Sequence, residues 1–195
     1  MEPASARSLL GFDIGVSATA VPIDETADYW LNAVGSDFST SGYLIVPRLV
    51  VSKGLGRATV AASVARIPDT EYGVYGASLD VPIIRGGLVT PALTLRGSYS
   101  ILSGVEVYDL ETYGAEVFLS KGFGPLTPYA AAGMTRVSAE GRVPGEGIPR
   151  FNLVDEFDHE RFTVGVRISM LIPKLVLEAT QGEELSYSAK ISLGL

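Results

Sequence analysis

The chain has 195 residues, with 15 Lys and Arg against 22 Asp and Glu, and hence a formal net charge of −7 at pH 7. This acidity argues against a nucleic-acid-binding protein, because few cations are available to neutralise phosphates. The composition, 47% hydrophobic and 19% charged, excludes a disordered chain, and the lack of cysteine excludes disulfides and thiolate chemistry.

Apolar residues alternate with small or polar ones along most of the chain, as expected for β-strands. In 11–22, Phe12, Ile14 and Val16 fall on one face and Asp13 and Ser17 on the other. The alternation is weaker in 43–53, 58–66, 128–139 and 175–181. In chain order, the expected strands are 11–22, 43–53, 58–66, 73–83, 92–101, 112–120, 128–139, 162–172, 175–181 and 186–195. The sequence therefore predicts an all-β chain of about ten strands, with eight or twelve as alternatives.

The two faces of these strands differ in a way that indicates a membrane. The polar face is mostly Gly, Ser, Thr and Ala with about one charge per strand, which suits a crowded lumen better than a solvated surface. The bulky aliphatic face would then contact lipid, as in an antiparallel up-and-down transmembrane β-barrel. No run of roughly 18 apolar residues predicts a transmembrane helix. A soluble, lipocalin-like barrel is the alternative.

The connections between strands alternate in length and predict an orientation. Long loops are expected at about 23–41 and 140–160, whereas the even-numbered strands end in tight turns. In outer-membrane barrels the longer loops are extracellular and the short turns periplasmic, so both termini are expected in the periplasm. We expect one domain, 1–195, with 1–10 as a periplasmic segment of a mature chain that has lost its signal peptide.

Aromatic residues on the apolar face predict two girdles at the membrane interfaces. Six of them fall at the outer ends of their strands, and Phe12 and Tyr129 fall at the inner ends. The outer six are Tyr43, Tyr75, Tyr99, Tyr113, Phe162 and Tyr187.

Charged residues on the polar face predict a network of ion pairs in the lumen, because unpaired buried charges are costly. We favour a structural network that plugs a narrow barrel, with a charged constriction that selects small solutes as the alternative. The expected inward charges are Asp13, Arg48, Asp80, Arg96, Glu116, Arg136, Arg167, Glu178 and Lys190.

Catalytic and metal sites find little support in the sequence. His159 is the single histidine and lies among acids in 156–160, where a solvated loop is the simplest interpretation. With one histidine and no cysteine, we expect no metal site, no cofactor and no catalytic residue.

The stretch Leu119–Tyr129, which reads LSKGFGPLTPY, followed by small residues up to Gly133, resembles outer-membrane β-barrel proteins of Gram-negative bacteria. It is similar in particular to an uncharacterised barrel family with comparable text. The resemblance implies insertion by the barrel-assembly machinery and contact with outer-membrane lipid and lipopolysaccharide. We expect a monomer with no nucleic-acid partner.

The predicted function is non-enzymatic: a structural barrel or a narrow passive channel for small solutes. Two alternatives are a rim-located enzyme, either an omptin-like protease or a lipid A-modifying enzyme, and a binding or adhesion module that uses the long loops.

Overall fold

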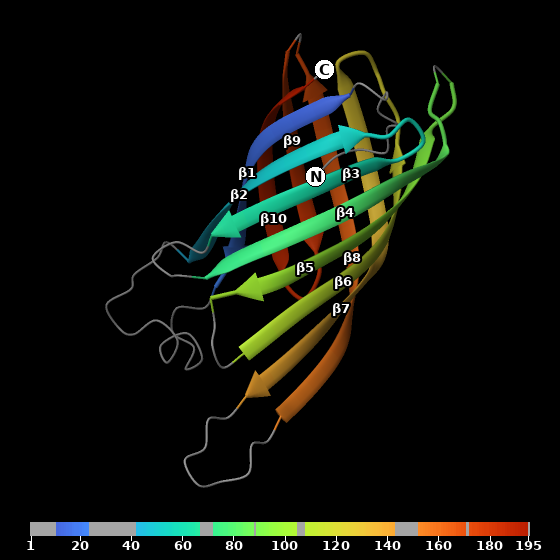
Figure 1. The fold of residues 1–195 in the computed structure, drawn as a ribbon. Helices are drawn as coiled ribbons and strands as arrows, with labels where there is room; N and C mark the ends of the chain where they lie inside the picture. Colours follow the sequence, from blue (N-terminus) through green and yellow to red (C-terminus); the bar gives the residue numbers. More distant parts are fainter. Residues whose placement is uncertain are drawn as a thin grey trace, which may run out of the picture.

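The chain forms a closed antiparallel β-barrel of ten strands, as the sequence predicts (Figure 1). The computed structural model describes residues 11–23, 42–66, 72–87, 89–104, 108–142, 152–170 and 172–194. Each strand pairs with its neighbours in sequence, and β1 pairs with β10 to close the barrel. The strands are β1 Phe12–Pro22, β2 Tyr43–Gly54, β3 Thr59–Arg66, β4 Gly73–Ile84, β5 Ala92–Ser103, β6 Tyr108–Ser120, β7 Leu126–Arg142, β8 Asn152–Ser169, β9 Pro173–Gln181 and β10 Leu185–Gly194.

The two ends of the barrel differ, and we name them the turn end and the loop end. The turn end holds the connections at 55–58, 85–91, 121–125 and 170–172, together with the start of β1 and the end of β10. The loop end holds the strand ends that flank 23–42, 67–72, 104–107 and 143–151, together with the connection at 182–184. Gly56 and Gly124 have φ angles of 79° and 60° at the turn end, a conformation that glycine adopts without strain.

Strands β7 and β8 continue beyond β9 at the loop end (Figure 1). The pairing of β7 with β8 extends to Arg142 and Asn152, whereas the pairing of β8 with β9 stops at Phe162 and Gln181. Most of the loop expected at 140–160 is therefore strand. The expectation was wrong here because 152–161 carries polar residues on both faces, which removes the apolar alternation that marks the other strands. The expected segments 1–10 and 23–41 lie outside the described residues, apart from Ile23.

The outward face is rich in exposed large apolar side chains, including Ile14, Val16, Ile45, Leu79 and Ile191. All six residues expected in the outer girdle are exposed on this face, and Tyr99 and Tyr113 are adjacent, with ring centroids 5.0 Å apart. Phe12 is also exposed on it, near the turn end. No helix among the described residues is long and apolar enough to cross a bilayer.

Strand β7 has the opposite facing from the one expected. Tyr129 points into the barrel and is 5% exposed, and Arg136 lies on the outer face, paired in register with Asp158. Tyr129 and Arg136 are seven residues apart, and residues an odd number apart in a strand lie on opposite faces. Assigning the wrong facing to β7 therefore misplaced both residues at once. Between them β7 carries mostly small residues on both faces, so no apolar pattern fixed the register and the aromatic ring was assigned to lipid.

Candidate functional site: the lumen

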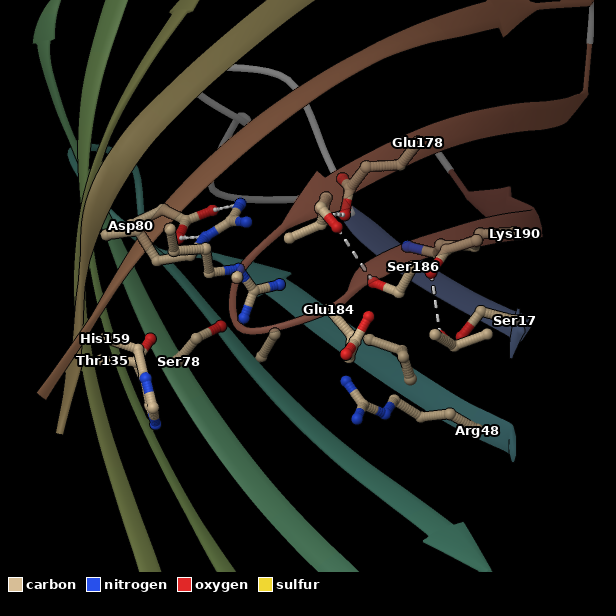
Figure 2. Close-up of a pocket in the computed structure, with 18 of the residues that line it drawn as sticks. Ser17, Arg48, Ser78, Asp80, Thr135, His159, Glu178, Glu184, Ser186 and Lys190 are labelled. Atoms are coloured by element: carbon tan, nitrogen blue, oxygen red, sulfur yellow. Dashed lines mark hydrogen bonds and ion pairs between the residues drawn. The ribbon is translucent and has the colours of Figure 1, made fainter. Parts of the chain in front are cut away.

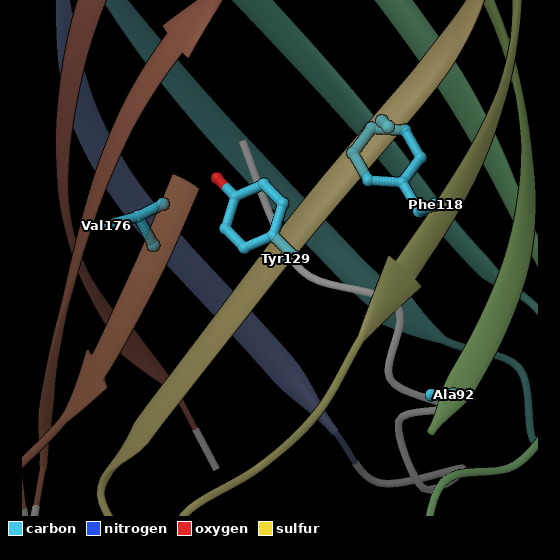
Figure 3. Close-up of a cluster of buried hydrophobic side chains, with 5 residues drawn as sticks. Ala92, Phe118, Tyr129 and Val176 are labelled. Carbon is cyan, nitrogen blue, oxygen red and sulfur yellow. The ribbon is translucent and has the colours of Figure 1, made fainter. Parts of the chain in front are cut away.

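The half of the lumen near the turn end is filled by side chains. Phe118 and Tyr129 project inward from β6 and β7 with their ring centroids 6.3 Å apart, and Val176 lies beside them on β9 (Figure 3). Phe118 is 2% exposed and Val176 is 1% exposed. We call Phe118, Tyr129 and Val176 the plug.

Glycines on neighbouring strands make room for long inward side chains. A Cβ on Gly165 would collide with the ring of Tyr129, its partner in register across β7 and β8. A Cβ on Gly15 would lie 2.7 Å from Cε of Lys190. The side chains of Tyr129 and Lys190 thus each pack over the backbone of a glycine, and this close approach makes room for long side chains in a narrow barrel.

Arg96 is held against the plug by two interactions. Its guanidinium carbon lies 4.1 Å from the centroid of Phe118, a cation–π contact. Its Nε and Nη2 donate to the two carboxylate oxygens of Asp80 at 2.7 and 2.9 Å. The pair is nearly buried, so the charges compensate each other where water cannot.

A second cluster joins the first and last strands. The Asp13 carboxylate is 0% exposed and accepts from Lys190 Nζ at 3.4 Å, Lys174 Nζ at 3.2 Å and the Ser192 hydroxyl at 3.2 Å. These contacts link β1 with β9 and β10 and close the turn end of the lumen beside the plug.

The remaining inward carboxylates are also engaged. Glu116 lies 3.3 Å from Nε of Arg161, and Glu178 accepts from the Tyr129 hydroxyl at 2.7 Å and from Thr180 at 3.3 Å. Of the nine expected lumen charges, the structure places eight inside the barrel and Arg136 outside. Arg167 contacts Thr127 at 3.4 Å.

Two inward cations escaped the sequence analysis, Arg161 and Lys174. Arg161 is an even number of residues from Arg167 in β8, and Lys174 is an even number from Glu178 in β9, so each shares the inward face of its strand. Arg161 fell between the loop expected at 140–160 and the strand expected at 162–172, and Lys174 fell just before the strand expected at 175–181. The alternation that could have found them was not extended far enough.

Among the described residues, side chains leave a space unfilled in the half of the lumen near the loop end. This half contains a cavity of about 430 Å³ that lies above the plug and reaches residues 182–184 of the β9–β10 connection. Figure 2 shows Arg48, Ser78, Lys190, Ser186, Asp80 and Glu178 among the side chains that line this space. We call it the cup.

His159 lines the cup on β8, two residues from Arg161 and not in a loop. Its Nε2 lies 3.9 Å from a carboxylate oxygen of Glu183, and its ring packs edge-on against Phe157 at 5.0 Å. Within the described ranges, no group of three or more His, Asp or Glu side chains is placed to hold a metal ion.

Outside the barrel wall, Arg136 and Asp158 form a pair on the extension of β7 and β8. Arg136 Nε and Nη2 donate to the two oxygens of Asp158 at 2.8 and 2.9 Å, and both side chains are exposed. These hydrogen bonds lower the pKa of Asp158 below its usual value of 3.8. The pair lies on the loop-end side of Phe162 and in register with Tyr113 of β6.

The chain matches no protein-family model, and no curated protein matches its sequence. Among solved structures it is similar to the β domain of the Bordetella autotransporter BrkA, with a TM-score of 0.43, 10% identity and coverage of 94% of this chain and 99% of that chain. LpxR from Salmonella typhimurium gives a TM-score of 0.42 at 10% identity, with 93% and 99% covered. The N-terminal β-barrel domain of Pseudomonas aeruginosa OprF gives 0.39 at 10% identity, with 96% and 98% covered. Similarity at this level carries no information on function.

Proposed function

We propose that the protein is a non-enzymatic barrel of the bacterial outer membrane whose lumen is closed to conduction and open as a polar cup on the cell exterior. The observation that carries this proposal is the plug. Phe118, Tyr129 and Val176 fill the turn-end half of the lumen together with the buried Asp13–Lys190 pair. A passive channel needs a water-filled path, and the burial of these side chains supports a closed path in this half of the lumen.

The membrane location rests on the outer face. Large apolar side chains that are more than half exposed, such as Val16 at 60% and Ile191 at 61%, are costly in water and stable against lipid. The closed sheet pairs the backbone groups around the whole wall, which a bilayer demands. Aromatic side chains near the loop end support a girdle at one interface.

The orientation follows the pattern of outer-membrane barrels, with short turns and both termini in the periplasm. The cup then faces outward, and its mouth lies near lipopolysaccharide. Closure of the sheet between β1 and β10 leaves no strand edge within the wall, which supports a monomer that contacts only lipid after assembly.

Conductance in a planar bilayer tests the proposal. The refolded protein, checked by the different gel migration of unheated and boiled samples, is expected to be silent. A variant that lacks both rings of the plug, Phe118→Ala with Tyr129→Ala, is expected to conduct. The matched control removes two aromatic rings from the outer face, Tyr99→Ala with Tyr113→Ala, and is expected to stay silent. Steady conductance by the unaltered protein would refute a closed lumen.

A further inference from the structure

Arg48 differs from the other cations that line the cup. It projects inward from β2, in register with Ser17 on β1 and Ala65 on β3 (Figure 2). Arg96, Arg161 and Lys190 each have a carboxylate within ion-pair distance. Arg48 has no hydrogen bond or ion pair with any residue that the structure describes, and its charged neighbours Arg161 and Glu178 act on it only at longer range. A guanidinium with five donors is therefore available inside the cup.

A second polar group on the same strand is also unpartnered. Ser52 lies on the same face of β2, deeper in the lumen, and is 5% exposed. Its hydroxyl lines the cup and makes no hydrogen bond with any residue in the described part of the chain. A buried hydroxyl without a partner is destabilising, and a polar group that enters the cup would supply the missing hydrogen bond.

The rest of the wall around Arg48 is rich in hydroxyl groups. Ser17, Ser78, Thr135, Ser186 and Ser188 all line the cavity. Hydroxyls both donate and accept hydrogen bonds, which suits a ligand with several hydroxyls of its own. The cavity of about 430 Å³ also falls within the size range of small-molecule sites.

Charge at the mouth limits the ligand further. Glu183 and Glu184 line the cavity at the β9–β10 connection, and Glu178 lines it near the floor. A polyanion would be repelled by these carboxylates, whereas a solute with one anionic group can reach Arg48 with its uncharged part near the acids.

We propose that the cup binds a small polyhydroxylated solute with a single oxyanion group, of the class of a phosphorylated or carboxylated monosaccharide, and that Arg48 holds the oxyanion. The guanidinium offers two parallel donors to a phosphate or carboxylate, and the serine and threonine hydroxyls bind the hydroxyls of the sugar. The direction of access, from the loop end, rests on the closed lumen proposed above.

Calorimetric titration of the refolded protein tests the site. The detergent should be a polyoxyethylene ether, because a sugar detergent would compete. The four probes are glucose 6-phosphate, glucuronate, glucose and inorganic phosphate. We expect the first two to bind more tightly than glucose, because only they offer an oxyanion, and more tightly than inorganic phosphate, because only they also offer hydroxyls. Equal affinity for glucose and glucose 6-phosphate would overturn the role of Arg48, and equal affinity for phosphate and glucose 6-phosphate would overturn the role of the sugar.

Variants of β2 provide the matched comparison. Arg48→Gln removes the charge and is expected to weaken glucose 6-phosphate binding roughly tenfold to a hundredfold, the effect of losing hydrogen bonds to a charged group. Lys53→Gln makes the same change in charge on the outer face of the same strand and is expected to leave binding unchanged. Undiminished binding by Arg48→Gln, or no binding of any probe by the unaltered protein, would refute the inference. A silent barrel that binds no probe refutes the ligand site alone, whereas a conducting barrel refutes the closed lumen.

Discussion

Replacement of Asp80 by asparagine perturbs the ion pair that anchors Arg96 over the plug. Asparagine keeps one acceptor oxygen, so one of the two hydrogen bonds, at 2.7 and 2.9 Å, is lost together with the negative charge. A hydrogen bond to a charged group contributes about 1.5–3 kcal/mol. The side chains of Arg96 and Asp80 are 11% and 20% exposed, so little water can replace the lost acceptor. We expect Asp80→Asn to lower the free energy of unfolding by about 2 kcal/mol.

Denaturant unfolding in lipid vesicles measures this loss, with the folded fraction read from the migration of unheated samples on a gel. Asp155→Asn makes the same chemical change at an exposed position of β8, and we expect it to change the free energy of unfolding by less than about 0.5 kcal/mol. Arg96→Met completes a double-mutant cycle, because methionine retains contact with the Phe118 ring without a charge. We expect a coupling energy of at least about 1.5 kcal/mol between positions 80 and 96. Additive effects in the cycle, or an Asp80→Asn variant as stable as the unaltered protein, would show that the pair does not stabilise the barrel.

Three further changes probe the lumen and the extension of β7 and β8. Gly165→Ala places a Cβ against the Tyr129 ring and 2.8 Å from the carbonyl oxygen of Leu177, so we expect the free energy of unfolding to fall by about 1–3 kcal/mol in the same assay. The control is Gly97→Ala, whose Cβ would meet nothing within 4 Å, and equal effects of the two changes would contradict the packing argument. Asp13→Asn leaves the buried Lys190 and the nearby Lys174 without their shared carboxylate, and we expect it to lower the free energy of unfolding by about 3–5 kcal/mol. Ser192→Ala removes one hydrogen bond to the same carboxylate and is expected to lower it by about 1 kcal/mol. Similar losses for the two variants would argue against a buried charge pair. The pKa of Asp158 is lowered by Arg136, so this pair contributes stability that is complete above the ordinary aspartate pKa of 3.8 and is lost as the pH falls through the lowered pKa of the folded state. Amide hydrogen exchange in 155–160 should therefore accelerate below that lowered pKa. An Arg136→Gln variant that kept the same pH dependence would exclude the pair as its cause.

The sequence was informative wherever one face of a strand is apolar and the other is not. The six strands with clear alternation were located correctly, and in four of them the alternation gave the outward position of an exposed tyrosine, namely Tyr75, Tyr99, Tyr113 and Tyr187. The same rule placed Asp13 and Lys190 on the inner face, because each lies between apolar neighbours in its own strand. These features depend on local pattern, which a period of two reports directly.

The rule failed where both faces are similar. The small residues of β7 fit either facing, and only the contact of Tyr129 with Glu178 and Gly165, made across other strands, decides between them. The pairing partners of charges were likewise beyond the sequence: Glu116 binds Arg161 two strands away, past Gly133, which pairs in register with both residues, and strand order alone does not indicate that register. The cup was not predicted either, since the heights at which inward side chains end are set by the tilt and stagger of all ten strands.

The contacts of Asp13 have a consequence for how the chain folds. They join residues separated by 161 to 179 positions in sequence, so none of them can form until the last two strands are present. Contacts of such high order are slow, which makes the meeting of β1 and β10 a late event in folding. A slip of one residue at this seam would turn Lys190 outward, and a slip of two would carry it past the carboxylate. The buried aspartate thereby makes a misaligned closure unstable, and a nascent chain that ends before Pro173 would lack both lysines and remain an open sheet.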